Sequence, residues 1–197
     1  MKVPIWIAVA SMLALLTTAC DIGIELVVAP DGSGEMRSVL KPTEDEVRAL
    51  SSFGMSSDEL CSGMQSGEMS LTADAVLVQE TDGATISCVD TRPFATLDDL
   101  ETSQEGFTIN RASIEGGCFV FDAVIAASGS SSGDGDFGAA LLKEFIGAIY
   151  FRLAPPGEID LASSNADAYG GNTATWDLMI GESRNVRLAS KTAGAAC

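Results

Sequence analysis

The chain has 197 residues, of which 28 are Asp or Glu and 11 are Lys or Arg, so its formal net charge is −17. Apart from Lys2, its lysines stand singly at Lys41, Lys143 and Lys191, and so acidic a surface excludes nucleic acid as a partner. The sequence contains no histidine, which excludes Ser-His-Asp and Cys-His nucleophiles, so we expect neither enzymatic activity nor a cofactor.

The first element resembles the lipobox of bacterial lipoproteins, in which a cysteine is lipidated and becomes the new N-terminus. Residues 15–20 read Leu-Leu-Thr-Thr-Ala-Cys, after a basic Lys2 and an apolar stretch over residues 3–16. This pattern predicts a lipoprotein signal peptide over residues 1–19, with Cys20 as the lipidation site. An ordinary signal peptide with an incidental cysteine, or an uncleaved anchor, is the alternative.

The residues after this cysteine indicate where in the cell envelope the protein is localised. Asp21 resembles the enterobacterial signal for retention at the inner membrane, which favours the periplasmic face of that membrane over the outer membrane. Residues 20–190 suit a single extracytoplasmic domain, followed by a tail over residues 191–197. No run of 18 apolar residues follows Ser190, so the lipid is the expected membrane anchor.

Four cysteines remain for the exported domain, namely Cys61, Cys88, Cys118 and Cys197. An even number of cysteines in an oxidising compartment predicts disulfides, and four cysteines allow three pairings. Proximity in sequence favours Cys61 with Cys88 and Cys118 with Cys197. Zinc is the rival interpretation, but the chain has no CxxC pair and no histidine, so we expect no metal site.

Alternating β-forming stretches flank turn sequences and predict three hairpins, at residues 22–28 with 35–40, 75–80 with 84–89, and 107–114 with 118–125. Thr43 and Glu46 form a capping box that opens a helix, and shorter helices are expected at 57–61 and 97–101. This order predicts an α+β fold: an antiparallel sheet built from successive hairpins, with a few short helices packed on one face.

Residues 128–138 are rich in Ser, Gly and Asp and predict a flexible loop. Asp134 and Asp136 in this loop do not complete a calcium-binding EF-hand pattern. Beyond the loop, apolar residues at steps of four predict an amphipathic helix, and they are Phe137, Leu141, Phe145 and Ile149. We interpret this helix as the cover of the sheet or, alternatively, as a membrane contact or a lid over a cavity.

The last third predicts strands at 150–153, 173–178 and 185–190. Its turn motifs resemble the closing segment of the LppM-type bacterial lipoprotein domain family; they are Pro156-Gly157-Glu158-Ile159, Asn165, Gly171-Asn172-Thr173 and Trp176-Asp177-Leu178. Asp31-Gly32-Ser33-Gly34 resembles the turn after the first strand of that family. The resemblance implies an extracytoplasmic mixed α and β domain with a role in lipid or glycolipid handling, and it transfers no binding residue.

Two functions fit these observations. The first is a non-catalytic binding module that holds a lipid or another envelope hydrophobe between sheet and helices, in a pocket lined by Phe119, Phe121, Leu141, Phe145 and Ile149. The alternative is an acidic interaction or scaffold subunit of a cell-envelope protein assembly. A cavity at these side chains favours the binding module, whereas a filled core with exposed apolar residues favours the interaction subunit.

Overall fold

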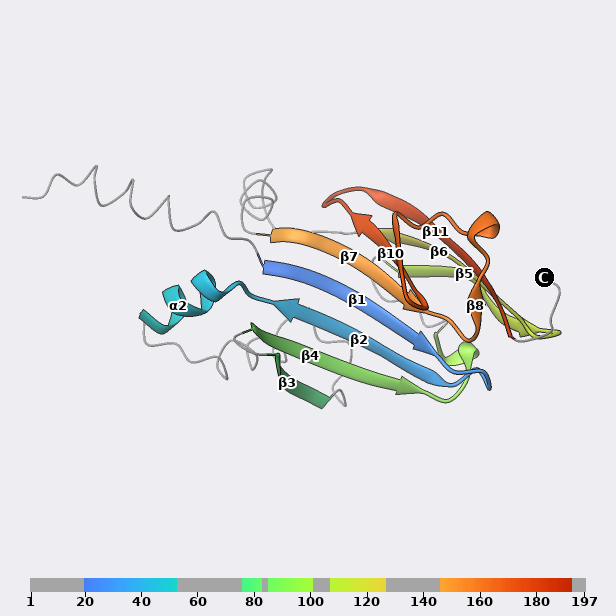
Figure 1. Cartoon of the computed structure of the whole chain (residues 1–197), viewed down its shortest axis with the longest axis horizontal. Coiled ribbons are helices and arrows are strands. Elements are labelled where there is room, and N and C mark those ends of the chain that lie inside the picture. Colours follow the sequence, from blue (N-terminus) through green and yellow to red (C-terminus); the bar gives the residue numbers. More distant parts are fainter. Residues whose placement is uncertain (1–19, 53–75, 83–84, 101–106, 127–145, 193–197) are drawn as a thin grey trace, which may run out of the picture.

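The structure, a computed structural model, describes residues 20–52, 76–82, 85–100, 107–126 and 146–192. Two sheets make up most of it (Figure 1). Sheet A has the order β3-β4-β2-β1-β7-β10-β9, with bounds β1 Cys20–Val28, β2 Gly34–Lys41, β3 Val76–Asp82, β4 Thr85–Phe94, β7 Ile146–Ala154, β9 Ala168–Gly170 and β10 Thr173–Leu178. Sheet B has the order β5-β6-β11-β8, with bounds β5 Phe107–Glu115, β6 Cys118–Ala126, β8 Glu158–Ile159 and β11 Ser183–Lys191.

Helices are short and few in the described ranges. They are α2 Glu44–Ser52, η1 Leu97–Leu100 and η2 Leu161–Ser163. The helix α2 begins three residues after β2 ends and lies beyond the end of sheet A rather than on its face (Figure 1). Within the described part of the chain, no helix has the length and apolar character needed to cross a membrane.

The predicted α+β fold class is wrong, because the chain is mostly β structure arranged in two sheets. The sheets are not antiparallel throughout, since β1 pairs with β7 in parallel. The expectation failed because it assigned all hairpins to one sheet that needed a helical cover. The two sheets instead cover each other, so their apolar faces are buried without helices.

The end of the predicted amphipathic helix is also wrong. Ile146 and Ile149 belong to β7, which lies between β1 and β10 in the middle of sheet A. A step of four residues satisfies both the helical and the strand period, so the stripe could not distinguish them. The β-forming residues 149–151, and the pairing of β7 with β1 and β10, show that this segment is a strand. The other predicted helical residues, 137–145, and the helix predicted at 57–61 lie outside the described residues.

All three predicted hairpins are confirmed. β1 pairs with β2, β3 with β4, and β5 with β6, each in antiparallel register. The first turn is held by Asp31, whose Oδ1 accepts hydrogen bonds from the Ser33 backbone N at 3.1 Å and from its Oγ at 2.7 Å. These hydrogen bonds lower the pKa of Asp31. The turn residues of the family resemblance therefore have a structural role here.

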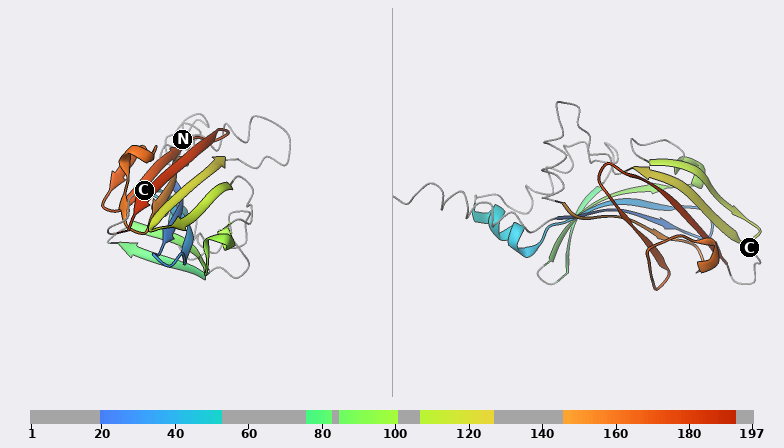
Figure 2. Two further views of the ribbon diagram at one scale, coloured as in Figure 1. Left: turned by 90° about the vertical axis from the view of Figure 1, so that its right-hand side faces the viewer. Right: turned by 90° about the horizontal axis from the view of Figure 1, so that it is seen from above.

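A cluster of aromatic side chains fills the space between the two sheets. Figure 2 shows the ribbons of these two sheets from two further sides. Phe121 of sheet B stacks on Phe151 of sheet A, with ring centroids 5.9 Å apart. Phe151 in turn contacts Trp176 at 5.6 Å, and Phe107 contacts Phe151 at 5.7 Å. Phe119, Phe121, Phe151 and Trp176 are fully buried, so these side chains form the centre of the core.

Candidate functional site

The structure places the described members of the predicted ligand pocket in the core. Phe119 and Phe121 point inward from β6 and are 0% exposed, with ring centroids 6.4 Å apart. Ile149 of β7 packs against the same core. Leu141 and Phe145 lie outside the described residues. The three described side chains thus pack against protein side chains, while a ligand space beneath residues 137–145 stays a prediction.

The predicted lipidation site stands at the very start of the fold. Cys20 is the first residue of β1 and pairs with Ile146 at the start of β7. Its neighbour Asp21 accepts a hydrogen bond from the Ala148 backbone N at 3.1 Å through Oδ1. Asp21 therefore connects the first residues of two parallel strands, a structural role that its sequence position did not suggest. Lipidation of Cys20 and the sorting role of Asp21 stay predictions.

Two of the four predicted disulfide cysteines lie in the described strands. Cys88 in β4 and Cys118 in β6 are both disulfide-bonded, and Cys88 is fully buried. The predicted partners, Cys61 and Cys197, lie outside the described residues. The pairing of the four cysteines thus stays a prediction.

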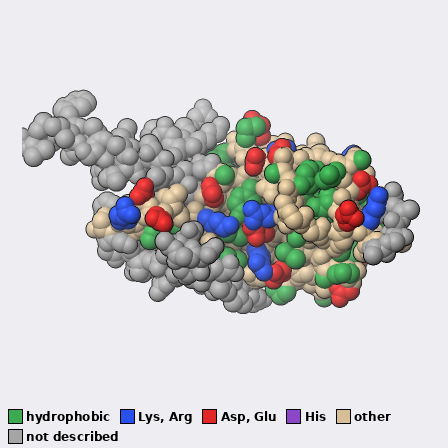
Figure 3. Space-filling model, viewed as in Figure 1, with side chains coloured by type: hydrophobic (Ala, Val, Ile, Leu, Met, Phe, Trp, Pro, Cys, Tyr) green, Lys and Arg blue, Asp and Glu red, His purple; other side chains and the backbone are tan. Residues whose placement is uncertain are grey.

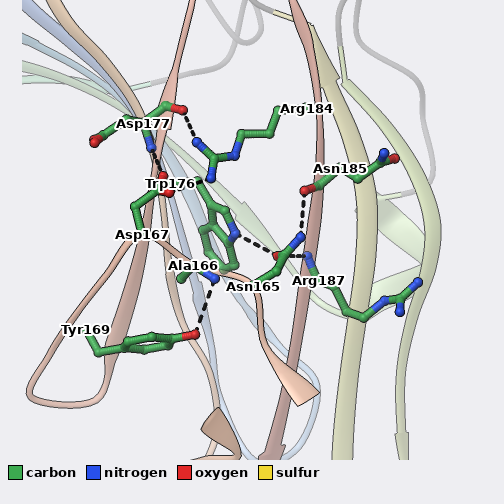
Figure 4. Close-up of polar contacts among 9 residues, drawn as sticks. All are labelled: Asn165, Ala166, Asp167, Tyr169, Trp176, Asp177, Arg184, Asn185 and Arg187. Carbon is green, nitrogen blue, oxygen red and sulfur yellow. Dashed lines mark hydrogen bonds and ion pairs between the residues drawn. The ribbon is translucent and has the colours of Figure 1, made fainter. Parts of the chain in front are cut away.

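The segment between β8 and β10 crosses from one sheet to the other. β8 pairs with β11 in sheet B, and β9 pairs with β10 in sheet A. Between them, η2 is capped by Asp160, whose Oδ1 accepts a hydrogen bond from the Ala162 backbone N. Residues 164–167 then run between β10 and β11, where two polar side chains join the sheets (Figure 4). We call Asn165 and Asp167 together the clasp.

Asn165 uses both atoms of its side-chain amide to join the sheets. Its Oδ1 accepts hydrogen bonds from Trp176 Nε1 of sheet A at 2.9 Å and from the Arg187 backbone N of sheet B at 2.8 Å. Its Nδ2 donates to the Asn185 carbonyl oxygen at 3.0 Å. Because Trp176 is fully buried, its indole N–H needs an acceptor, and Asn165 supplies it (Figure 4).

Asp167 makes a second connection of the same kind two residues later. Its Oδ2 accepts the Asp177 backbone N–H of β10 at 2.8 Å, and its Oδ1 pairs with Arg184 of β11 at 2.6 Å. Partial burial acts to raise the pKa of Asp167, but the hydrogen bonds from Arg184 and Asp177 outweigh it and hold this pKa below its usual value. The charged form of Asp167 is therefore the one that joins the sheets.

The chemistry of the clasp is structural. Each polar atom described above is engaged with a partner inside the protein, so no nucleophile or acid–base pair is presented to a substrate. The resemblance motifs drew attention to Asn165 and Trp176 in the sequence, but not to their contact. Asp167 and Arg184 were missed entirely, because no local pattern marks a pair that meets only across two sheets.

A second polar group lies on the outer face of sheet A, where Lys and Arg side chains gather over β1 and β2 (Figure 3). The ring of Tyr150 covers Gly23, and a Cβ added there would lie 2.1 Å from Tyr150 Cζ. The Tyr150 hydroxyl donates to Glu25 Oε1 at 3.2 Å, and Arg152 pairs with the same oxygen at 2.8 Å. Burial, together with the Glu25 charge, raises the pKa of Tyr150, so it stays a neutral hydrogen-bond donor.

Three large apolar side chains are exposed in the described part of the molecule. Leu161 of η2 is 62% exposed, Tyr169 of β9 is 40% exposed, and Met179 in the turn after β10 is 64% exposed. Tyr169 is held in place by a hydrogen bond that its hydroxyl oxygen accepts from the Ala166 backbone N at 3.2 Å. Leu161 and Tyr169 therefore present apolar surface from the segment that carries the clasp.

Comparisons with known proteins give one structural neighbour. No protein-family model and no curated protein sequence matches the chain. The folded domain of LppM from Mycobacterium tuberculosis, solved by NMR, is similar in structure with a TM-score of 0.48 and 13% sequence identity, over 89% of this chain and 91% of that one. At this identity and TM-score, the likeness transfers no residue role, ligand or partner to this chain.

Proposed function

We propose that this chain is an extracytoplasmic lipoprotein, tethered through Cys20, whose domain acts by binding a protein partner at its surface. The observation that carries this proposal is the filled space between the sheets. Phe119 and Phe121 are 0% exposed and stack on each other, and Phe121 also stacks on Phe151 of the opposite sheet, where an apolar ligand would have to enter. Admitting an acyl chain there would require these rings to leave a packed core.

The surface supplies what an interaction subunit needs. The formal net charge of −17 makes approach by a basic protein surface favourable. Exposed Leu161 and Tyr169 offer apolar contacts on a segment that the clasp holds in place. β1 begins at Cys20, whereas Tyr169 lies beside Ala174 and Leu153 at the other end of β7, so a lipid on Cys20 would leave this surface facing away from the membrane and open to a partner.

Acyl labelling tests the tether. Cells expressing the full chain are fed an alkyne fatty acid, and the wild type is compared with Cys20→Ala. We expect label on the wild type alone and a precursor of higher mass for the variant, because the predicted cleavage requires the lipidated cysteine. Equal labelling of both chains, or label on neither, would remove the lipoprotein part of the proposal.

Fatty-acid uptake tests surface binding against the predicted lipid pocket. We expect the purified full chain to show no saturable uptake of a fluorescent fatty acid. Saturable uptake that is lost in the variant Leu141→Ser/Phe145→Ser, with unchanged unfolding, would establish the lipid-binding module instead. Leu161 belongs to the exposed surface and not to the predicted pocket, so the variant Leu161→Ser is the control and should not alter any uptake.

A further inference from the structure

Strand β5 forms one edge of sheet B. Among the described strands it borders only β6. Its inward-facing side chains Ile109, Ala112 and Ile114 are only partly buried, whereas those of β6 opposite them are fully or almost fully buried. Among the described strands, the outer edge of β5 thus has no neighbour and lies beside incompletely covered apolar side chains, which is the kind of edge that a further strand can extend.

The outward-facing side chains of β5 carry a self-complementary charge pattern. Arg111 and Glu115 flank Ser113 on this face, since they lie opposite Asp122, Cys118 and Val120 of β6. Within one chain, Arg111 and Glu115 approach to 3.7 Å, but their side chains are 54% and 76% exposed, so this ion pair contributes little to stability. Both charges are therefore available to a partner strand.

We propose that β5 pairs with β5 of a second copy of this chain, antiparallel about a two-fold axis at Ser113. In this register, Arg111 lies opposite Glu115 of the partner subunit, and Glu115 lies opposite Arg111 of the partner subunit. Ala112 likewise meets Ile114 of the partner subunit on the inner face, which extends the apolar layer. One strand thus supplies both halves of a symmetric interface.

The charges select this register over its neighbours. A two-fold axis at Arg111 places two arginines opposite each other, and an axis at Glu115 does the same with two carboxylates, which repel. The irregularity in the β5–β6 register between Ile109 and Arg111 changes the face on which the preceding residues lie. Pairing is consequently confined to residues 111–115, and the interface is small.

A small interface can suffice for chains held on one membrane, and this step rests on the proposed function. Two tethered copies share a surface, which raises their effective concentration far above that in solution. The two-fold axis of an antiparallel pair stands normal to sheet B, so both copies keep sheet A, and with it Cys20, on the same side. Both anchors can therefore enter one bilayer.

Cysteine cross-linking in membranes tests the register. In the full chain, Ser113→Cys puts two cysteines opposite each other at the axis, with Cα atoms about 4.5–5.5 Å apart, within reach of a disulfide. Thr108→Cys is the matched control, since its two copies would be separated by ten residues, about 34 Å. We expect a disulfide-linked dimer for Ser113→Cys alone. Equal cross-linking of both variants, or none, would overturn the proposal.

Charge reversal gives a second readout that does not depend on folding. In the Ser113→Cys chain, Arg111→Glu or Glu115→Arg should lower the cross-linked fraction about tenfold, since each places like charges opposite each other twice. The double reversal Arg111→Glu/Glu115→Arg should restore it. Absence of restoration would contradict the register and would indicate that this charged, irregular edge blocks pairing.

The same cross-linking on the chain purified in detergent separates the two proposals. A dimer that forms at high concentration in both Ser113→Cys and Ser113→Cys/Cys20→Ala supports β5 pairing whatever anchors the chain. Loss of acyl label with the dimer retained would overturn the tether alone. Acyl label without the dimer would overturn the β5 interface alone.

Discussion

The side chain of Asn165 accepts the indole N–H of Trp176 at 2.9 Å and, with the same oxygen, the Arg187 backbone N–H at 2.8 Å. One carbonyl oxygen thus joins the buried centre of sheet A to the backbone of sheet B. Its two lone pairs permit both bonds, and the amide nitrogen adds a third to the Asn185 carbonyl oxygen. Asn165, an exposed residue between two strands, thus satisfies the indole N–H of Trp176, the largest fully buried side chain.

Replacing Asn165 by Ala should destabilise the domain by about 2 kcal/mol, because the buried Trp176 N–H loses its acceptor. Urea unfolding measures the change. Asn185→Ala is the matched control, since Asn185 contributes its backbone oxygen rather than its side chain to the clasp. A loss no larger than that of the control would show that the clasp does not hold the sheets together.

The pair between Asp167 and Arg184 should make part of the stability depend on pH. The pKa of Asp167 is lowered in the folded protein from its usual 3.8. Its contribution is therefore present above about pH 4 and is lost as the pH falls through the lowered value. Asp167→Asn should cost about 1 kcal/mol or less at pH 7, since the pair is partly exposed, and nothing near pH 2. Unfolding in urea at both pH values measures this, and a difference in unfolding free energy between wild type and Asp167→Asn that persists at pH 2 would contradict this role of Asp167.

Gly157→Ala should be among the most damaging glycine substitutions. Gly157 has φ +90°, and an added Cβ would lie 2.2 Å from the Lys191 carbonyl oxygen. Gly171 also has positive φ, at +59°, but no atom lies within 4 Å of its added Cβ, so Gly171→Ala is the control. We expect a cost of about 1 kcal/mol for the control and about 3 kcal/mol or more for Gly157→Ala. Equal unfolding midpoints would refute the close approach of β8 and β11.

Phe121→Ala distinguishes a core residue from a pocket residue. Truncating a fully buried phenylalanine in a packed core should cost about 3 to 5 kcal/mol of unfolding free energy. Val124 of the same strand faces the other side, and Val124→Ala should cost about 1 kcal/mol. A Phe121→Ala variant of unchanged stability would instead place Phe121 at a ligand cavity.

Local signals in the sequence predicted the strands well. The Asp31-Gly32 turn and the Asp82-Gly83 dipeptide correctly marked two hairpins, because such turns impose antiparallel pairing on their flanks. The assignment of strands to two sheets could not be predicted, since it depends on β7 adding in parallel to β1, more than a hundred residues earlier in the chain. Local patterns do not specify such a pairing.

The candidate site was less predictable than the strands. Phe119 and Phe121 were named as pocket residues because they are apolar, but the same property suits a core, and their 0% exposure in the structure fits a core. The clasp was missed because Asp167 meets Arg184 only after β10 and β11 have joined different sheets. Long-range polar pairs of this kind leave no periodic pattern in the sequence.

The central claim is that the protein is held by lipid on Cys20 and binds partners at its surface rather than a lipid between its sheets. Native mass spectrometry of the full chain, released gently from membranes, tests both parts. We predict the mass of the polypeptide from Cys20 onward plus its covalent acyl groups, with no further lipid retained. A co-purified lipid that survives this release, or a mass without acyl groups, would contradict the account.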